Sequence, residues 1–184
     1  MLRKTLLTLV LALPLAAAGQ SGEQLIERYT TLAGSKQNAG SLVDGLRDGK
    51  QVRLTRGTST ETFTPPTGKM GYGNVDNALA LAEASLKEQG ITNPTPAQLE
   101  AALMGGSVTT ASGRTVKLEG ILQMRADGKG WGQIAQSLGF KLGDVKRSDK
   151  AQPQAAHADR VARVERPNKP EKPERPEKPE RPGR

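Results

Sequence analysis

Proline recurs at every third residue near the C-terminus and limits where this chain can build a core. Six prolines stand at positions 167, 170, 173, 176, 179 and 182 of the segment RPNKPEKPERPEKPERPGR. Proline lacks a backbone N–H, and a period of three matches the three residues per turn of a polyproline II helix, whose backbone makes no internal hydrogen bonds. We therefore interpret residues 148–184 as a disordered, basic tail rich in Pro, Glu, Lys and Arg.

The other end of the chain has the layout of a secretory signal peptide. A short basic start precedes an apolar run from Leu6 to Leu15, and small residues follow up to Ala18. The run is shorter than the roughly 20 residues that a bilayer-spanning helix needs, so cleavage after Ala18 is favoured over a membrane anchor. We expect a signal peptide over 1–18, a periplasmic or secreted location, and no stable membrane insertion after cleavage.

The net charge and the absence of cysteine limit the partners and the reactions that we expect for this chain. The formal net charge is +8, and loss of the two basic residues of the leader leaves +6. A basic chain favours polyanionic partners through counterion release and surface attraction. The chain has no cysteine, which excludes a lipid-modified lipoprotein, disulfides and thiolate chemistry.

Residues 20–147 carry the patterns of one small α+β domain that is mainly helical. Helical spacing predicts a helix between Ser21 and Gly34 and a shorter helical turn around 42–46, which Gly45 weakens. Alternation predicts a β-hairpin over 52–63. Further on, the sequence predicts an αα-hairpin that starts at the cap Asn74 and ends at Gly105, and then a short extended pair around Ser112–Gly113.

A glycine-rich stretch precedes the αα-hairpin. Gly68, Gly71 and Gly73 surround Lys69 and superficially suggest a phosphate loop. The dinucleotide-binding spacing and a Gly-Lys-Ser/Thr ending are both missing, and no strong buried strand comes before. We interpret the stretch as a glycine-rich turn, with phosphate or nucleotide binding as the lesser alternative.

The segment LEGILQMRADGKGWGQIAQSLGFKLGDVKR resembles, over residues 121–147, the helix-turn-helix of sigma-factor-like and related transcription regulators. The likeness is carried by an I-A-x-x-L-G pattern and by a valine at the expected distance after the turn, which are Ile134, Ala135, Leu138, Gly139 and Val145. It implies that the second helix lies in the DNA major groove. Its possible anion or nucleic-acid contacts are Lys141, Lys146 and Arg147.

A structural role explains the same pattern. The second helix lacks a Ser or Thr cap, contains Gly143 and carries few side chains that read bases, and export removes the chain from chromosomal DNA. We therefore expect a C-terminal cluster of three helices with a core of Trp131, Ile134, Ala135, Leu138, Gly139 and Val145, extended by Ile121, Leu122, Met124 and Leu142.

A second resemblance covers residues 62–145. The stretches FTPPTGKMGYGN, ITNPTPAQLEAAL and MRADGKGWGQIAQSLG together look like a group of small exported bacterial proteins of unassigned function. This resemblance implies a secreted or periplasmic address and no particular reaction.

The inventory of reactive side chains is small. His157 is the sole histidine and falls in the predicted tail, so no catalytic triad or multi-histidine metal site is expected. Asp44 and Asp48 share a helix face, but no companion carboxylate or motif accompanies them, which favours solvated carboxylates over a hydrolase pair. We predict no catalytic residues, no metal and no cofactor. The expected function is that of an exported, non-enzymatic interaction protein whose partner is an unknown protein or an anionic envelope polymer, with a nucleic-acid-binding protein as the alternative.

Overall fold

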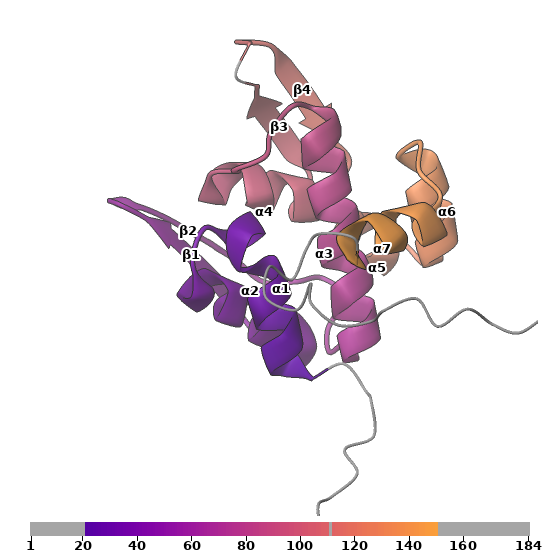
Figure 1. Ribbon diagram of the computed structural model, residues 1–184, viewed down its shortest axis with the longest axis horizontal. Helices are drawn as coiled ribbons and strands as arrows, with labels where there is room; N and C mark the ends of the chain where they lie inside the picture. The colour runs from indigo at the N-terminus through magenta and orange to yellow at the C-terminus, as the bar shows by residue number, and fades with distance from the viewer. Residues whose placement is uncertain (1–20, 111, 151–184) are drawn as a thin grey trace, which may run out of the picture. The chain divides into compact units, whose positions relative to one another are not determined.

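The computed structural model describes residues 21–110 and 112–150, so the predicted signal peptide and residues 151–184 of the predicted tail lie outside the described residues. The order of the elements is α1 (Gly22–Ala33), α2 (Lys36–Asp48), β1 (Val52–Arg56), β2 (Ser59–Phe63), α3 (Tyr72–Glu88), α4 (Pro96–Met104), β3 (Gly106–Thr109), β4 (Thr115–Leu118), α5 (Ile121–Ala126), α6 (Trp131–Ser137) and α7 (Leu142–Lys150) (Figure 1).

The prediction of a mainly helical α+β fold is confirmed. The strands form two antiparallel hairpins, β1 with β2 and β3 with β4. The first hairpin pairs Val52 with Phe63, and the second pairs Gly106 with Leu118. No helix in the described part of the chain is long and apolar enough to cross a bilayer.

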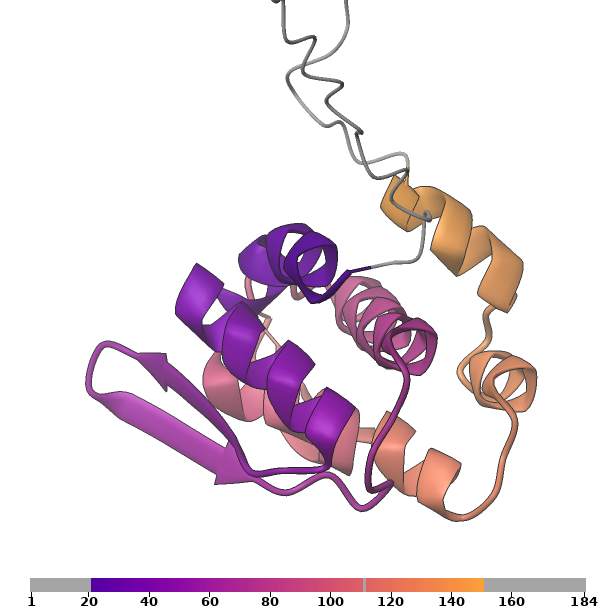
Figure 2. The ribbon, with the colours of Figure 1, turned by 90° about the horizontal axis from the view of Figure 1, so that it is seen from below.

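Helix α3 is the centre of the domain. Figure 2 views it nearly end-on, with α1 and α2 on one side and α6 and α7 on the other. It contacts α1, α2, α4, α5 and α7. A helix that is buried on all sides is expected to be apolar around its circumference, and its buried residues are mostly small or aliphatic: Val75, Asp76, Ala78, Leu79, Ala80, Leu81, Ala82, Ser85 and Leu86. Asp76 is the exception, and its charge requires a partner.

Local capping signals set several helix ends as expected. Ser21 forms a capping box with Gln24 at the start of α1, and Gly34 ends the helix in the left-handed region at φ 78°. Thr95 and Gln98 form a second capping box at the start of α4. The C-terminal helix α7 continues to Lys150, three residues past the predicted domain boundary at 147.

Helix α2 is longer than the short turn that was predicted. It runs from Lys36 to Asp48 and is capped by Ser35, whose side chain accepts a hydrogen bond from the Asn38 backbone N–H. A Cβ on Gly45 would lie 2.5 Å from Cγ2 of Val52. The glycine therefore lets strand β1 lie directly on the helix, and the packing gained there offsets the low helix propensity of glycine.

The outer edge of β1 is closed by side chains of α2. Asn38 is 4% exposed, and its amide accepts a hydrogen bond from the Thr55 N–H and donates one to the Thr55 carbonyl, each at 3.0 Å. Ser41 Oγ accepts from the Arg53 N–H at 2.8 Å. Asn38 thus pairs with β1 much as a neighbouring strand would.

Helices α5, α6 and α7 follow one another along one side of α3 and α4. Ile134 and Ala135 of α6 are fully buried, and Val145 of α7 is 7% exposed. Trp131 and Leu138 are partly buried against the same core, while Gly139 turns the chain at φ 84° and is exposed.

Candidate anion-binding pocket

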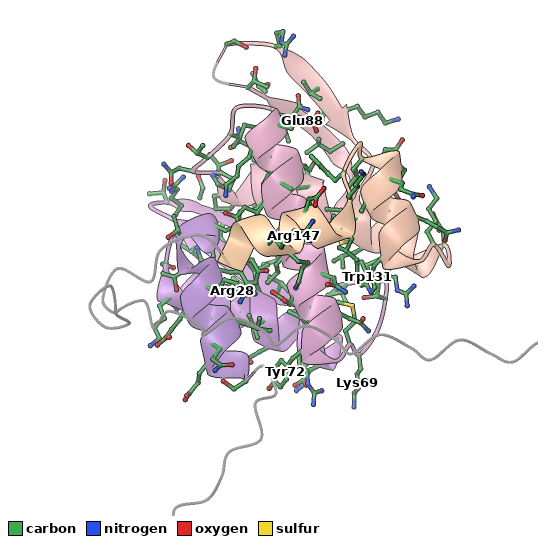
Figure 3. The ribbon with its side chains drawn as sticks, turned by 45° about the vertical axis from the view of Figure 1, so that its right-hand side comes forward. Arg28, Lys69, Tyr72, Glu88, Trp131 and Arg147 are labelled. Carbon is green, nitrogen blue, oxygen red and sulfur yellow. The ribbon has the colours of Figure 1, made fainter. Side chains whose placement is uncertain are left out.

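A polar pocket of about 460 Å³ opens beside the N-terminal end of α3. Its walls come from the β2–α3 loop, the first turn of α3, the end of α5 and the α5–α6 turn. The lining residues are Pro66, Thr67, Lys69, Met70, Asn74, Arg125, Ala126 and Gly128. Figure 3 shows Lys69 and Tyr72 at this end of the molecule, with Glu88 at the opposite end of α3.

The loop that carries Lys69 is fixed against the end of α2. The Met70 N–H donates to the Arg47 carbonyl at 3.1 Å. Gly68 takes φ 65°, a conformation that favours glycine, and its carbonyl carbon would lie 2.7 Å from a Cβ on Gly49. This close approach of two backbones holds the loop in place and leaves Lys69 exposed at the pocket.

Arg125 is held on the other wall without a carboxylate. Its Nη1 donates to the Lys129 carbonyl at 2.9 Å, and its guanidinium lies 5.2 Å from the centroid of the Trp131 ring. The Trp131 indole N–H in turn donates to Asn74 Oδ1 at 2.9 Å. One chain of contacts therefore orders Arg125, Trp131 and Asn74 across the boundary between α3 and α6.

Two basic side chains of the pocket are left without an acidic partner. Within residues 21–110 and 112–150, neither Lys69 nor Arg125 forms an ion pair with a carboxylate. The nearby Asp48 is held by Lys50 at 3.1 Å. The hydrogen bond from Lys50 and its charge lower the pKa of the Asp48 carboxyl, and the charges of Arg47 and Lys69 add smaller contributions.

Two further features of the pocket favour a negative charge. The Thr67 hydroxyl is enclosed and has no hydrogen-bond partner within the described residues. The 17-residue helix α3 begins at the N-cap Gly71, which offers no side-chain cap, and its first turn carries no acidic residue. The partial positive charge of the helix terminus is therefore not offset locally.

A second group of charges lies deeper in the domain and joins three helices. Asp76 of α3 has a side chain only 1% exposed, and its Oδ1 accepts from Arg28 Nη1 at 2.8 Å and from the Tyr29 hydroxyl at 2.6 Å. Its Oδ2 forms an ion pair with Lys146 of α7. We call Asp76, Arg28, Tyr29 and Lys146 the Asp76 cluster. It ties α1 and α7 to the central helix.

The three cations predicted as anion or nucleic-acid contacts are not brought together. Lys146 faces α3 and belongs to the Asp76 cluster. Arg147 is exposed and pairs with Asp144 of its own helix. Lys141 is exposed beside an apolar pocket of about 450 Å³, which is also lined by Ala84, Lys87, Gly139, Phe140, Asp144 and Val145.

Sequence reasoning noticed Lys69 but interpreted its surroundings as a glycine-rich turn, and it missed Thr67, Asn74 and Arg125 as neighbours. Asn74 was expected to cap α3, yet it lies inside the helix as its third residue, and its side chain bonds Trp131. Arg125 and Asn74 are distant in sequence, and no local pattern predicts that they meet.

The two carboxylates considered from the sequence, Asp44 and Asp48, both lie on α2. Asp44 is exposed on α2, and Asp48 is engaged by Lys50. No group of three or more His, Cys, Asp or Glu side chains that could hold a metal ion lies within the part of the chain that the structure describes. The donors at the polar pocket suit the binding of an anion.

No family model, curated protein or solved structure matches this chain.

Proposed function

We propose that this protein is an exported, non-enzymatic interaction protein of the periplasm or cell envelope, and that it holds an anionic group of its partner in the polar pocket beside α3. The leader-like N-terminus and the basic charge of the chain support the location and the sign of the partner's charge. An anionic envelope polymer fits best, because its charged groups suit the basic lining of the pocket and the positive net charge of the chain.

The observation that carries the proposal is the pair Lys69 and Arg125, which line one polar pocket and have no carboxylate partner in the described residues. A charge-assisted hydrogen bond is roughly twice as strong as a neutral one, so an anion that satisfies both side chains gains more there than at scattered surface lysines. The indole of Trp131 and the backbone of Lys129 hold the guanidinium of Arg125 in place, which reduces the entropy lost on binding.

The C-terminal helices serve packing in this proposal. Helices α5–α7 form the three-helix cluster that resembles a helix-turn-helix, and α3 with α4 forms the αα-hairpin on which it rests. A DNA-reading role for α7 is disfavoured because Lys146 is engaged by the buried Asp76. Nucleic-acid binding is retained as an outcome that the experiments below distinguish.

The location is tested by fractionating cells and sequencing the N-terminus of the mature chain. We expect the protein in the periplasm or the medium, beginning at Gly19. A cytoplasmic chain that retains Met1 would contradict the export proposal and would favour the nucleic-acid alternative.

The pocket is tested by measuring the binding of the mature chain to a soluble envelope polymer that carries anionic groups, at several salt concentrations. The double variant Lys69→Ala/Arg125→Ala is compared with Arg114→Ala/Lys117→Ala, which removes one arginine and one lysine exposed on or next to β4. We expect the pocket variant to lose at least about tenfold in affinity and the control about twofold or less. Equal losses would show that only the net charge matters, and they would overturn the proposed pocket.

A further inference from the structure

We infer that the anionic group taken by the pocket is a phosphate monoester carried on a sugar or polyol. This inference rests on the proposed function and names the chemistry of its ligand. The number of donors, the balance of charge and the size of the pocket support it, and none of these depends on the N-terminus of α3.

The donors at the pocket come from three side chains, which suits the three terminal oxygens of a phosphate. Arg125 presents a planar guanidinium with five N–H groups, of which one Nη1 hydrogen is given to the Lys129 carbonyl. Asn74 accepts from Trp131 through Oδ1, which leaves its amide N–H groups for a ligand. Lys69 adds an ammonium from the opposite loop. A phosphate offers three terminal oxygens as acceptors, whereas a carboxylate offers two in one plane.

The charge of the pocket also matches that of a phosphate monoester. Lys69 and Arg125 supply two positive charges, and neither forms an ion pair with a carboxylate of the described residues. A phosphate monoester carries about −1.5 to −2 at neutral pH, whereas a carboxylate, a sulfate ester or a phosphodiester carries a single negative charge. Only the monoester neutralises both side chains with one group.

The enclosed hydroxyl of Thr67 gives the pocket an additional donor. Its Oγ1 has no partner in the described residues and is covered by its surroundings. A buried hydroxyl without a partner is unfavourable, because it has lost its hydrogen bonds to water. Rotation about χ1 on binding brings the hydroxyl to a phosphate oxygen and relieves that loss.

The volume of the pocket favours a phosphate ester over free phosphate. At about 460 Å³ the pocket falls in the range of small-molecule sites and far exceeds the roughly 30 Å³ that one water occupies in the liquid. Its lining is mostly polar, so the remaining space suits hydroxyl-rich carbon, as in a sugar or a polyol.

Calorimetric titration of the mature chain with three matched ligands tests the inference: glucose 6-phosphate, glucose 6-sulfate and glucuronate. We expect glucose 6-phosphate to bind at least about tenfold more tightly than the other two at pH 7.5. Because the second pKa of a phosphate ester is about 6, its affinity should fall severalfold between pH 7.5 and 5, while that of the sulfate stays constant. Equal or tighter binding of glucuronate or the sulfate would overturn the phosphate inference and leave the proposed function standing.

Two conservative variants and a short DNA duplex complete the test. Arg125→Lys keeps the charge but loses the planar guanidinium, and Thr67→Val replaces the unpartnered hydroxyl with a methyl group. Each should weaken glucose 6-phosphate binding about three- to tenfold. Neither should lower the unfolding temperature of the unbound chain, and Thr67→Val should raise it. A short DNA duplex that binds more tightly per phosphate than glucose 6-phosphate, and depends on Arg125, would overturn the monoester in favour of nucleic acid. If none of these ligands binds and the pocket variant behaves like its control with the polymer, both the inference and the proposed function fail.

Discussion

The Asp76 cluster and the polar pocket are both built on the first turns of α3, yet they treat their cations in opposite ways. In the cluster, Arg28 and Lys146 meet a carboxylate that is 1% exposed. In the pocket, Lys69 and Arg125 are positioned by a loop, a backbone carbonyl and an aromatic ring, and meet no carboxylate in the described residues. The difference separates charges that hold helices together from charges that are left for a ligand.

The largest expected effect is that of removing the carboxylate from the cluster. Asp76→Ala leaves Arg28 and Lys146 partly buried without this carboxylate, and it removes one acceptor of the fully buried Tyr29 hydroxyl, which keeps the backbone carbonyl of residue 76 at 3.1 Å. Breaking one partner of a buried pair costs about 3–5 kcal/mol, and the partial exposure of both cations places the expected loss near 3 kcal/mol. Urea unfolding measures it, with Asp44→Ala as the control at about 0.5 kcal/mol or less.

A smaller loss is expected when only the hydroxyl of the cluster is removed. Tyr29→Phe keeps the ring in the core but removes the hydrogen bond of 2.6 Å to Asp76 Oδ1. Hydrogen bonds to charged groups contribute about 1.5–3 kcal/mol, so the free energy of unfolding should fall by about 1.5 kcal/mol. An unchanged unfolding free energy would show that the two cations alone hold the carboxylate.

Substitutions in the pocket should weaken anion binding and have little effect on the free energy of unfolding. Lys69→Ala should change the free energy of unfolding by about 0.5 kcal/mol or less, because Lys69 is exposed and stabilises no buried charge. Arg125→Ala should cost about 1 kcal/mol or less, because it removes only the hydrogen bond to Lys129 and the contact with the Trp131 ring. Both variants should nevertheless weaken anion binding. Thermal unfolding with and without the polymer measures the two effects together, and a loss of stability equal to that of Tyr29→Phe would place these residues with the structural charges.

The smallest effect concerns the exposed pair at the edge of the pocket. Lys50 lowers the pKa of the Asp48 carboxyl from its ordinary value of 3.8. A lowered folded-state pKa contributes stability that is present above the unfolded value and is lost as the pH falls through the folded value, here below about pH 4. Lys50→Ala should move the pKa of Asp48 upward in a carboxyl NMR titration and leave unfolding at pH 7 almost unchanged.

The parts of the fold that sequence could predict are those with a local signal. Ser21 and Gly34 fix the ends of α1 to within one residue, and alternation around Val52 locates the first hairpin. The helix predicted around Gly45 was too short, because glycine has a low helix propensity. The sequence does not show that β1 packs against this glycine, where a side chain would not fit. Tertiary packing outweighed propensity there.

The candidate site was accessible to sequence reasoning only in part. Lys69 drew notice because glycines surround it, but its counterpart Arg125 lies 56 positions later and is ordered by Trp131 and Lys129. Lys146 had the composition of a phosphate contact, and only the burial of Asp76 explains why it faces inward. Whether a cation is structural depends on a carboxylate carried by another helix. A local sequence pattern does not contain that information.

The amide of Asn38 also matters for how these molecules behave when they are crowded. A two-stranded ribbon with a bare border is a template onto which another polypeptide can add, and repetition of that step leads to fibres. Because one side chain occupies both backbone groups of Thr55, that border offers no docking register to a neighbouring copy. Addition of a further strand at this border of β1 is therefore disfavoured.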